Sequence, residues 1–224
     1  MSWPGYRAES EPGLGFSPIG ALVMVLIPVK AFDQAKNRLA GALAPEARSD
    51  LARRMAERVI AAAGDLPVAV VCENSGVAEW ASSCGARPIA QQGSGLNAAV
   101  TSGVAALAGL GAERVIVAHS DLPLARDLTW VGSSDGITLV PDRHGDGTNV
   151  LCVPTGLGFR FGYGSGSFAR HRREAARFDV SLRIVTDTRL SWDVDEPADL
   201  RAVDAAGFRA PGWRDRPHRP ASED

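Results

Sequence analysis

The sequence predicts a single α/β domain with a mostly parallel sheet, and three observations support this. Short apolar runs that suit buried strands alternate with segments of helical periodicity. Two of these runs, 136–142 and 149–155, are joined by a short turn region, RHGDG, which predicts an antiparallel hairpin added to the sheet. The chain of 224 residues with 45% hydrophobic content can bury one core of ordinary size. We therefore expect one three-layer α/β/α domain.

Ten segments make up this pattern. The expected strands are 21–29, 67–73, 114–120, 136–142, 149–155 and 182–187. The expected helices are 45–64, 76–85, 95–111 and 167–178. In the first helix, Leu51, Met55 and Val59 recur near helical spacing, while Arg and Glu occupy the other face. In an open sheet of this class, ligands bind outside the carboxyl ends of the strands, so the residues after each strand are the candidates for a site.

The two ends and the composition set limits on the function. Segments 1–20 and 209–224 are rich in Pro, Gly and charge, so we expect poorly ordered tails around a domain at 21–208. The net charge of −2 gives no case for nucleic acid or an acidic membrane surface. The cysteines Cys72, Cys84 and Cys152 are scattered, which favours a reducing cytoplasm over a disulfide framework or a zinc site. The apolar run near the start is too short to span a bilayer.

Basic residues follow the first expected strand, in PVKAFDQAKNRL. Lys30 and Lys36 are the only lysines of the chain, and Arg38 follows closely. Such charges suit a triphosphate, because they can offset its negative charge as it develops during reaction. The phosphate-binding pattern GxxxxGK[ST] is absent, so an ordinary P-loop ATPase is not favoured. A merely solvated basic loop explains the same residues.

Acidic residues follow two later strands. Asp121, in SDLPL, ends a buried run and is placed to bind a divalent cation, although it also suits the cap of a following turn. Asp193 and Asp195, in DVDEPADL, would point to one face if extended, and such a pair needs a cation such as Mg²⁺. Helix capping would explain Asp195 but not Asp193. His119, just before Asp121, fits a core or loop histidine.

A glycine- and serine-rich stretch, FGYGSGSFARHRREA, spans residues 161–175. Glycines such as Gly162 and Gly164 allow successive N–H groups to point one way, and a helix beginning near Ser167 adds its positive end. This combination predicts an anion site, with one or two side chains of Arg170, His171, Arg172 and Arg173 reaching the ligand. A flexible linker is the alternative, but linkers avoid the aromatic residues interleaved here. The nearby Gly147-Thr148 fits either an anion contact or ordinary hairpin chemistry.

Together these segments resemble a known family. The ordered set is PVK…AKNRL, GLNAAV, SDLPL, DRHGDGTNVL, FGYGSGSFARH and DVDEPADL. It is similar to the guanylyltransferases of coenzyme F(420) biosynthesis, which act on phosphoenolpyruvate or 2-phospho-L-lactate and are related to molybdopterin guanylyltransferase-like nucleotidyltransferases. The resemblance covers about residues 21–206. Two positions depart from the family pattern: Ser120 stands where glycine is common, and Ser165 where proline is common.

The resemblance implies a Rossmann-like, GT-A-type nucleotidyltransferase fold and assigns roles to the candidate residues. It implies that Thr148, Gly164 and Ser167 bind phosphoenolpyruvate, and that Asp121, Asp193 and Asp195 hold Mg²⁺. It also implies that Lys30, Lys36 and Arg38 engage the GTP phosphates and that Asn97 lines the nucleoside side. Asp121 and Lys30 would be the catalytic pair. The reaction so implied transfers GMP from GTP to phosphoenolpyruvate, and its product would pass to a downstream deazaflavin transferase.

Other functions fit the same sequence less well. The acceptor could instead be 2-phospho-L-lactate or 3-phosphoglycerate, and the Arg-rich composition, typical of a GC-rich bacterium, favours phosphoenolpyruvate only by analogy. Nucleotidyltransferases of the molybdenum cofactor or of sugar phosphates share the fold, but the glycine-rich LxAGGxSxRMG loop that we associate with them is missing. A non-catalytic nucleotide-binding module would not need three acidic metal ligands.

Overall fold

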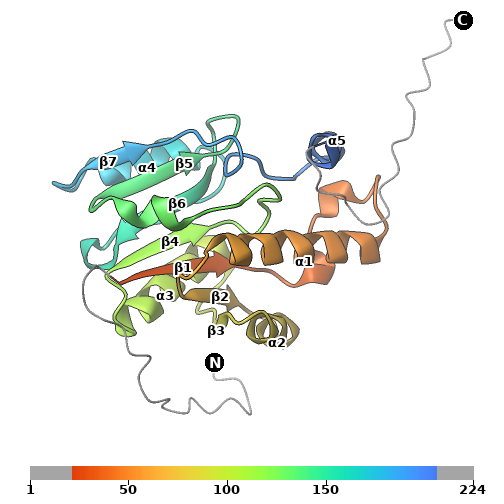
Figure 1. Ribbon diagram of the computed structural model, residues 1–224, viewed down its shortest axis with the longest axis horizontal. Coiled ribbons are helices and arrows are strands. Elements are labelled where there is room, and N and C mark those ends of the chain that lie inside the picture. The colour runs from red at the N-terminus through yellow and green to blue at the C-terminus, as the bar shows by residue number, and fades with distance from the viewer. Residues whose placement is uncertain (1–21, 206–224) are drawn as a thin grey trace, which may run out of the picture.

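The computed structural model describes residues 22–205, which form one sheet with helices on both faces (Figure 1). The strands are β1 (Val23–Pro28), β2 (Val68–Cys72), β3 (Arg87–Ala90), β4 (Arg114–Ala118), β5 (Ile137–Pro141), β6 (Thr148–Pro154) and β7 (Leu182–Ile184). The α-helices are α1 (Pro45–Ala62), α2 (Ser75–Ser83), α3 (Gly95–Gly109), α4 (Ser167–Ala175) and α5 (Pro197–Ala205). Short 3₁₀ helices lie at η1 (Phe32–Gln34), η2 (Asn37–Leu39), η3 (Thr129–Ser133) and η4 (Thr155–Leu157). The expected tails, 1–20 and 209–224, lie outside the described residues.

The sheet has the order β3-β2-β1-β4-β6-β5-β7. β1 pairs in parallel with β2 and with β4, and β2 pairs in parallel with β3. β6 runs antiparallel to both of its neighbours, β4 and β5, and β5 pairs in parallel with β7. In the described part of the chain β6 is thus the one reversed strand. The prediction of a mostly parallel sheet with an inserted antiparallel hairpin is confirmed.

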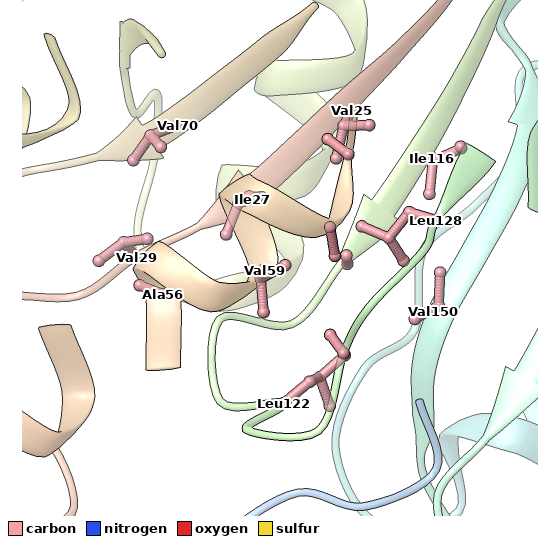
Figure 2. Packing of buried hydrophobic residues seen from close by; sticks show 14 of the residues in the cluster. Val25, Ile27, Val29, Ala56, Val59, Val70, Ile116, Leu122, Leu128 and Val150 are labelled. Carbon is pink, nitrogen blue, oxygen red and sulfur yellow. The ribbon is translucent and has the colours of Figure 1, made fainter. Parts of the chain in front are cut away.

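Two apolar layers enclose the sheet because alternate strand residues point to opposite faces. On one face, strand residues such as Val25, Ile27 and Ile116 pack against α1, α2 and the segment that follows β4. Figure 2 shows Ala56 and Val59 of α1 over these strands. On the other face, α3 packs over β1, β2 and β4, and α4 packs over β5 and β6. This is the expected three-layer α/β/α arrangement.

The structure confirms the six expected strands and four expected helices, with ends that differ by a few residues. β3 was not predicted. Its four residues, RPIA, are only partly buried, so they form no apolar run. Pro88 is tolerated because β3 lies at the edge of the sheet, where a missing N–H leaves no ladder bond unmade. None of the helices in residues 22–205 has the length and apolar character needed to cross a bilayer.

Candidate active site

One edge of the sheet gathers the candidate residues. β1 and β4 are parallel, so the residues that follow them, including Lys30 and Asp121, leave the sheet at the same edge. β6 runs the other way, so its first residue, Thr148, lies at this edge too. The hydrogen bond from His119 N to Asn149 O, 3.0 Å long, joins the end of β4 to the start of β6.

Two adjoining cavities open along this edge. One has a volume of about 360 Å³ and is lined by Lys36, Arg38, Asp121 and Asp195, among others. The second has a volume of about 530 Å³ and lies against the ends of β2 and β3 and the start of α3. Both are lined by Lys30, which therefore stands between them.

Lys36 bridges two of the predicted carboxylates. Its Nζ lies 2.6 Å from Asp121 Oδ2 and 3.3 Å from Asp195 Oδ1, and its side chain is 10% exposed. Burial lowers the pKa of Lys36, but the negative charges of Asp121 and Asp195 outweigh it, so the pKa is raised. Burial raises the pKa of Asp121, but the positive charge of Lys36 outweighs this effect, so the pKa is lowered. Both groups are therefore charged near neutral pH. Arg38, an exposed side chain, places Nη1 3.7 Å from Asp195 Oδ2.

Asp193 turns to a different cation, Arg143. Arg143 Nη1 donates to the backbone oxygen of Asp193 at 2.9 Å and to its Oδ1 at 3.3 Å. Its Nη2 donates to Asp199 Oδ1 at 2.6 Å. Burial raises the pKa of Asp193, and the nearby negative charge of Asp121 raises it further. Asp193 and Asp195 therefore lie close enough to Asp121 to interact, but they do not share one cation as their spacing predicted.

Helix α5 is capped by Asp199 and not by Asp195. The N–H groups of Asp195 and Glu196 both donate to Asp199 Oδ2 at 2.8 Å. The capping alternative for Asp195 is therefore wrong, because Asp195 is the residue whose N–H is capped and its carboxylate points to Lys36. Arg143 and Asp199 together hold the segment that carries both acidic side chains.

The carboxylates offer a partial set of metal ligands. In residues 22–205, no group of three or more His, Cys, Asp or Glu side chains is arranged around a common point that suits a metal ion. Asp121 Oδ1 is nevertheless buried and has no hydrogen-bond partner among the described residues. A hard cation with oxygen ligands would satisfy that atom.

The glycine- and serine-rich loop is built as an N–H-rich turn before α4. Gly164 and Gly166 have φ values of +111° and +71°, a region that glycine enters without strain. Ser167 N donates to Gly164 O at 2.9 Å, and Gly166 N donates to the carboxylate of Asp146 at 2.9 Å. The backbone N–H groups of Gly164 and Ser165 have no partner in the described part of the chain. The loop is thus consistent with an anion cradle made of those two N–H groups. A third N–H group of the loop, that of Gly166, is already bonded to the carboxylate of Asp146.

The two hydroxyls assigned to the acceptor are both covered. Thr148 is 1% exposed and Ser167 2% exposed. Thr148 Oγ1 lies 3.0 Å from His171 Nδ1. This contact joins β6 to α4, the helix that follows the glycine- and serine-rich loop.

The side chains of the basic run on α4, residues 170–173, lie in different environments. Arg170 turns back onto the loop, where its Nε donates to Gly162 O at 2.8 Å and its Nη2 to Gly164 O at 3.2 Å. His171 is fully buried, whereas Arg172 and Arg173 are exposed. Arg170 therefore stiffens the loop, and the surface charge of Arg172 and Arg173 is solvated as expected.

Asn97 lies against this loop and not in either cavity. Its Oδ1 accepts from Tyr163 N at 2.6 Å, and its Nδ2 donates to Tyr163 O at 3.4 Å. Neither cavity is lined by Asn97. In this structure Asn97 ties α3 to the glycine- and serine-rich loop, which its place in GLNAAV did not predict.

The sequence matches the family described as "Guanylyl transferase CofC like" over residues 23–207. This chain belongs to that family. Phosphoenolpyruvate guanylyltransferase of Rubrobacter xylanophilus is 34% identical over 206 residues, with 88% of this chain and 98% of that protein covered. 2-phospho-L-lactate guanylyltransferase of Halorubrum lacusprofundi is 34% identical over 203 residues, with 84% and 90% covered. The chain is thus a nucleotidyltransferase of the CofC-like family.

Solved structures support the fold. A putative nucleotide-diphospho-sugar transferase from Desulfovibrio desulfuricans G20 is similar with a TM-score of 0.64 and 17% sequence identity, covering 82% of this chain and 87% of that one. A nucleotidyl transferase from Methanothermobacter thermautotroptrophicus is similar with a TM-score of 0.57 and 14% identity, covering 84% and 98%. The predicted Rossmann-like nucleotidyltransferase fold is confirmed.

Three residues of the site were missed by sequence reasoning: Arg143, Asp146 and Asp199. All three lie in quoted motifs, DRHGDG and DVDEPADL, so their positions were visible. Their roles were not, because each depends on a partner in a distant segment. Arg143, for example, bonds to a residue 56 positions away.

Proposed function

We propose that this protein transfers GMP from GTP to the phosphate of phosphoenolpyruvate. The products are enolpyruvoyl-2-diphospho-5′-guanosine and diphosphate, and the step belongs to coenzyme F(420) biosynthesis. Sequence relatives carry the proposal, since the proteins of Rubrobacter xylanophilus, Sphaerobacter thermophilus and Chloroflexus aggregans, 31–34% identical to this chain, are named phosphoenolpyruvate guanylyltransferases. The single structural observation that supports it best is the pair of adjoining cavities that share Lys30, beside an N–H-rich loop.

The proposed reaction needs charge and alignment more than a general base. An oxygen of the acceptor phosphate attacks the α-phosphorus of GTP, and diphosphate leaves with the electrons of the broken bond. The acceptor phosphate is an anion near pH 7, so no proton has to be removed before attack. The chain's part is to hold two polyanions in line and to offset their repulsion. We assign Lys30, Lys36 and Arg38 to the phosphates of GTP, and Thr148, Gly164 and Ser167 to the acceptor.

We further propose that Mg²⁺ is the cofactor and that Asp121, Asp193 and Asp195 hold it. Support comes from the unpartnered oxygen of Asp121 and from Lys36, whose ammonium group already sits as a cation between Asp121 and Asp195. When bound, Mg²⁺ would neutralise charge on the triphosphate. Lys36 would then release its carboxylates and turn to the phosphates.

A cytoplasmic location and coupling to a downstream deazaflavin transferase complete the proposal. The three cysteines are free thiols, and two of them are buried, which suits a reducing compartment. A downstream transferase would draw off the product and favour turnover.

The test is diphosphate release from purified protein with Mg²⁺. GTP, ATP, CTP and UTP are each combined with phosphoenolpyruvate, 2-phospho-L-lactate and 3-phosphoglycerate, with and without the downstream transferase and its deazaflavin acceptor. We expect turnover with GTP and phosphoenolpyruvate. Turnover with another acid would change the acceptor, and GTP binding without release in any combination would indicate a nucleotide-binding module.

Two variants connect the assay to the site. Asp121→Asn and Asp193→Asn are expected to lose at least about a hundredfold in rate, since each removes a carboxylate that would hold the Mg²⁺ and so weakens the cationic charge that offsets the transition state's negative charge. Asp50→Asn is the matched control. Asp50 is an exposed residue of α1 whose partner is the exposed Arg53, so its loss should leave turnover unchanged. Near-normal rates in both Asp121→Asn and Asp193→Asn would remove the metal assignment.

A further inference from the structure

His171 is a buried histidine whose two ring nitrogens are both engaged. It lies on α4, is 0% exposed, and packs beside the rings of Phe159 and Tyr163 at centroid distances of 5.8 and 4.8 Å. Gly162 N donates to His171 Nε2 at 3.0 Å, and Nδ1 lies 3.0 Å from Thr148 Oγ1. The ring thus joins the glycine- and serine-rich loop to the first residue of β6.

These contacts fix which nitrogen carries the proton. A backbone N–H can only donate, so Nε2 must present its lone pair to Gly162. Burial lowers the pKa of His171 to about 4, and the positive charge of Arg170 acts in the same direction. The imidazole is therefore neutral near pH 7, and its one proton is on Nδ1.

The protonated Nδ1 in turn fixes the polarity of the Thr148 hydroxyl. Nδ1–H donates to Thr148 Oγ1, so Oγ1 acts as the acceptor in that bond. The hydroxyl hydrogen then points away from His171 and remains to be donated elsewhere. No other hydrogen bond to this hydroxyl is found within residues 22–205.

A hydroxyl held as a donor is what an anion requires. Phosphate and carboxylate oxygens only accept hydrogen bonds when ionised, so a hydroxyl that presented its lone pairs would repel them. Fixing its direction in advance also removes the cost of reorienting it when the ligand binds.

We propose that His171 is a positioning residue that holds the Thr148 hydroxyl as a hydrogen-bond donor for an anionic group of the acceptor. This role rests on the proposed function, because it takes Thr148 to contact the acceptor. His171 itself touches no substrate. Thr148 is 1% exposed, so an acceptor oxygen reaches its hydroxyl only when the groups that cover it shift. Since Gly162 is bonded to Nε2, the same ring steers the loop and the hydroxyl.

The tautomer can be measured without any substrate. Long-range ¹H–¹⁵N NMR of the full chain distinguishes the two neutral tautomers from the imidazolium, and His171→Gln assigns the signal among the four histidines. We expect a neutral ring protonated at Nδ1 at pH 7. A ring protonated at Nε2, or a cationic ring, would overturn the proposal.

Matched substitutions then separate the two bonds. Asn places an amide near the position of Nδ1 and can still donate to Thr148, whereas Gln reaches the position of Nε2 and can only replace the bond to Gly162. We expect His171→Gln to weaken phosphoenolpyruvate binding, measured by calorimetry, about tenfold, the equivalent of one charge-assisted hydrogen bond. His171→Asn should weaken it about threefold or less on the same reasoning, and GTP binding should hold within about twofold in both.

A double-mutant cycle with Thr148→Val gives the decisive comparison. Once the hydroxyl is absent, His171→Gln should cause no further loss of phosphoenolpyruvate affinity. A full additional loss in the Thr148→Val background would overturn the role, because His171 would then act independently of Thr148. An equal loss of GTP and phosphoenolpyruvate affinity would also overturn it, since that pattern indicates general damage to the fold.

The outcomes distinguish this role from the proposed function. If folded wild-type protein with the Nδ1 tautomer binds no phosphoenolpyruvate, the proposed acceptor is wrong and the role falls with it. If phosphoenolpyruvate is turned over, but the ring is not protonated at Nδ1 or the double-mutant cycle shows that His171 acts independently of Thr148, only the role of His171 is wrong.

Discussion

The interaction between Arg143 and Asp199 should contribute measurably to both stability and activity. The guanidinium Nη2 lies 2.6 Å from Asp199 Oδ1, and the two side chains are 23% and 6% exposed. Truncating one partner of a fully buried pair costs about 3–5 kcal/mol, because the other charge is left without compensation. The partial exposure of Arg143 reduces this, so we expect Arg143→Met and Asp199→Asn each to lower the free energy of unfolding by about 2 kcal/mol.

The double variant isolates the pair. Because the two singles remove the same contact, the double variant should lose less than their sum, with a coupling energy of about 1–2 kcal/mol. The free energies come from urea unfolding followed by tryptophan fluorescence, which the five tryptophans make sensitive. Arg143→Met should also slow guanylyl transfer, because the Asp193 carboxylate loses its anchor.

Another ion pair of the same chain serves as the control. Arg53 and Asp50 are 3.4 Å apart on the surface of α1, with side chains 42% and 58% exposed. Solvent screening limits such a pair to about 0.2–0.5 kcal/mol. A coupling energy for Arg143 and Asp199 no larger than that for Arg53 and Asp50 would refute the reasoning that this pair clamps the acidic segment.

Three further predictions concern single residues. Lys36→Met should reduce transfer at least about a hundredfold in steady-state assays, because it removes a cation from the phosphate region, and a rate within about threefold of normal would contradict this. Ser167→Ala should weaken phosphoenolpyruvate binding about tenfold while GTP binding, measured in parallel, is unchanged; equal effects would argue against an acceptor cradle. The pKa of His171 is lowered to about 4, so its contribution to stability is complete above pH 6.5 and is lost as pH falls toward 4. At about 1.4 kcal/mol per pKa unit, this loss is roughly 3 kcal/mol. The free energy of unfolding of wild type should therefore exceed that of His171→Gln by roughly 3 kcal/mol less at pH 4 than at pH 6.5. A difference between the two proteins that does not change with pH would contradict this prediction.

Most of the fold was predictable because it depends on local apolar pattern. Runs such as those at β1 and β4 are continuous and buried on both faces, which strongly indicates central parallel strands. β3 could not be predicted in this way, because an edge strand of four partly exposed residues contains no continuous apolar run. Its existence depends on β2, which offers a free edge for pairing.

The candidate site was predictable in membership but not in pairing. Strand ends indicated Lys36, Asp121 and Asp195 separately, and the structure brings these three together. That Asp193 pairs instead with Arg143 follows from the approach of the β5–β6 turn to the segment before α5, a contact across 50 positions. Sequence spacing gives the direction of side chains within one segment, but it does not specify which distant cation each one meets.

The reversal of β6 explains how one edge of the sheet can contain two chemically different sets of groups. Parallel strands β1 and β4 bring their carboxyl ends to this edge, and the loops that follow carry the charged side chains Lys30 and Asp121. A sheet with only parallel strands would offer nothing else there, because the amino ends lie at the opposite edge. β6 lies between β4 and β5 and runs backwards, so its amino end, Thr148, comes to the same edge with the turn before it. Helix α4 then sets His171 against Thr148 and brings the N–H groups of the loop beside it. In the reaction proposed above, charged groups for the triphosphate and neutral donors for the acceptor would therefore come from opposite strand directions, which would let the chain hold two anions side by side with separate sets of ligands.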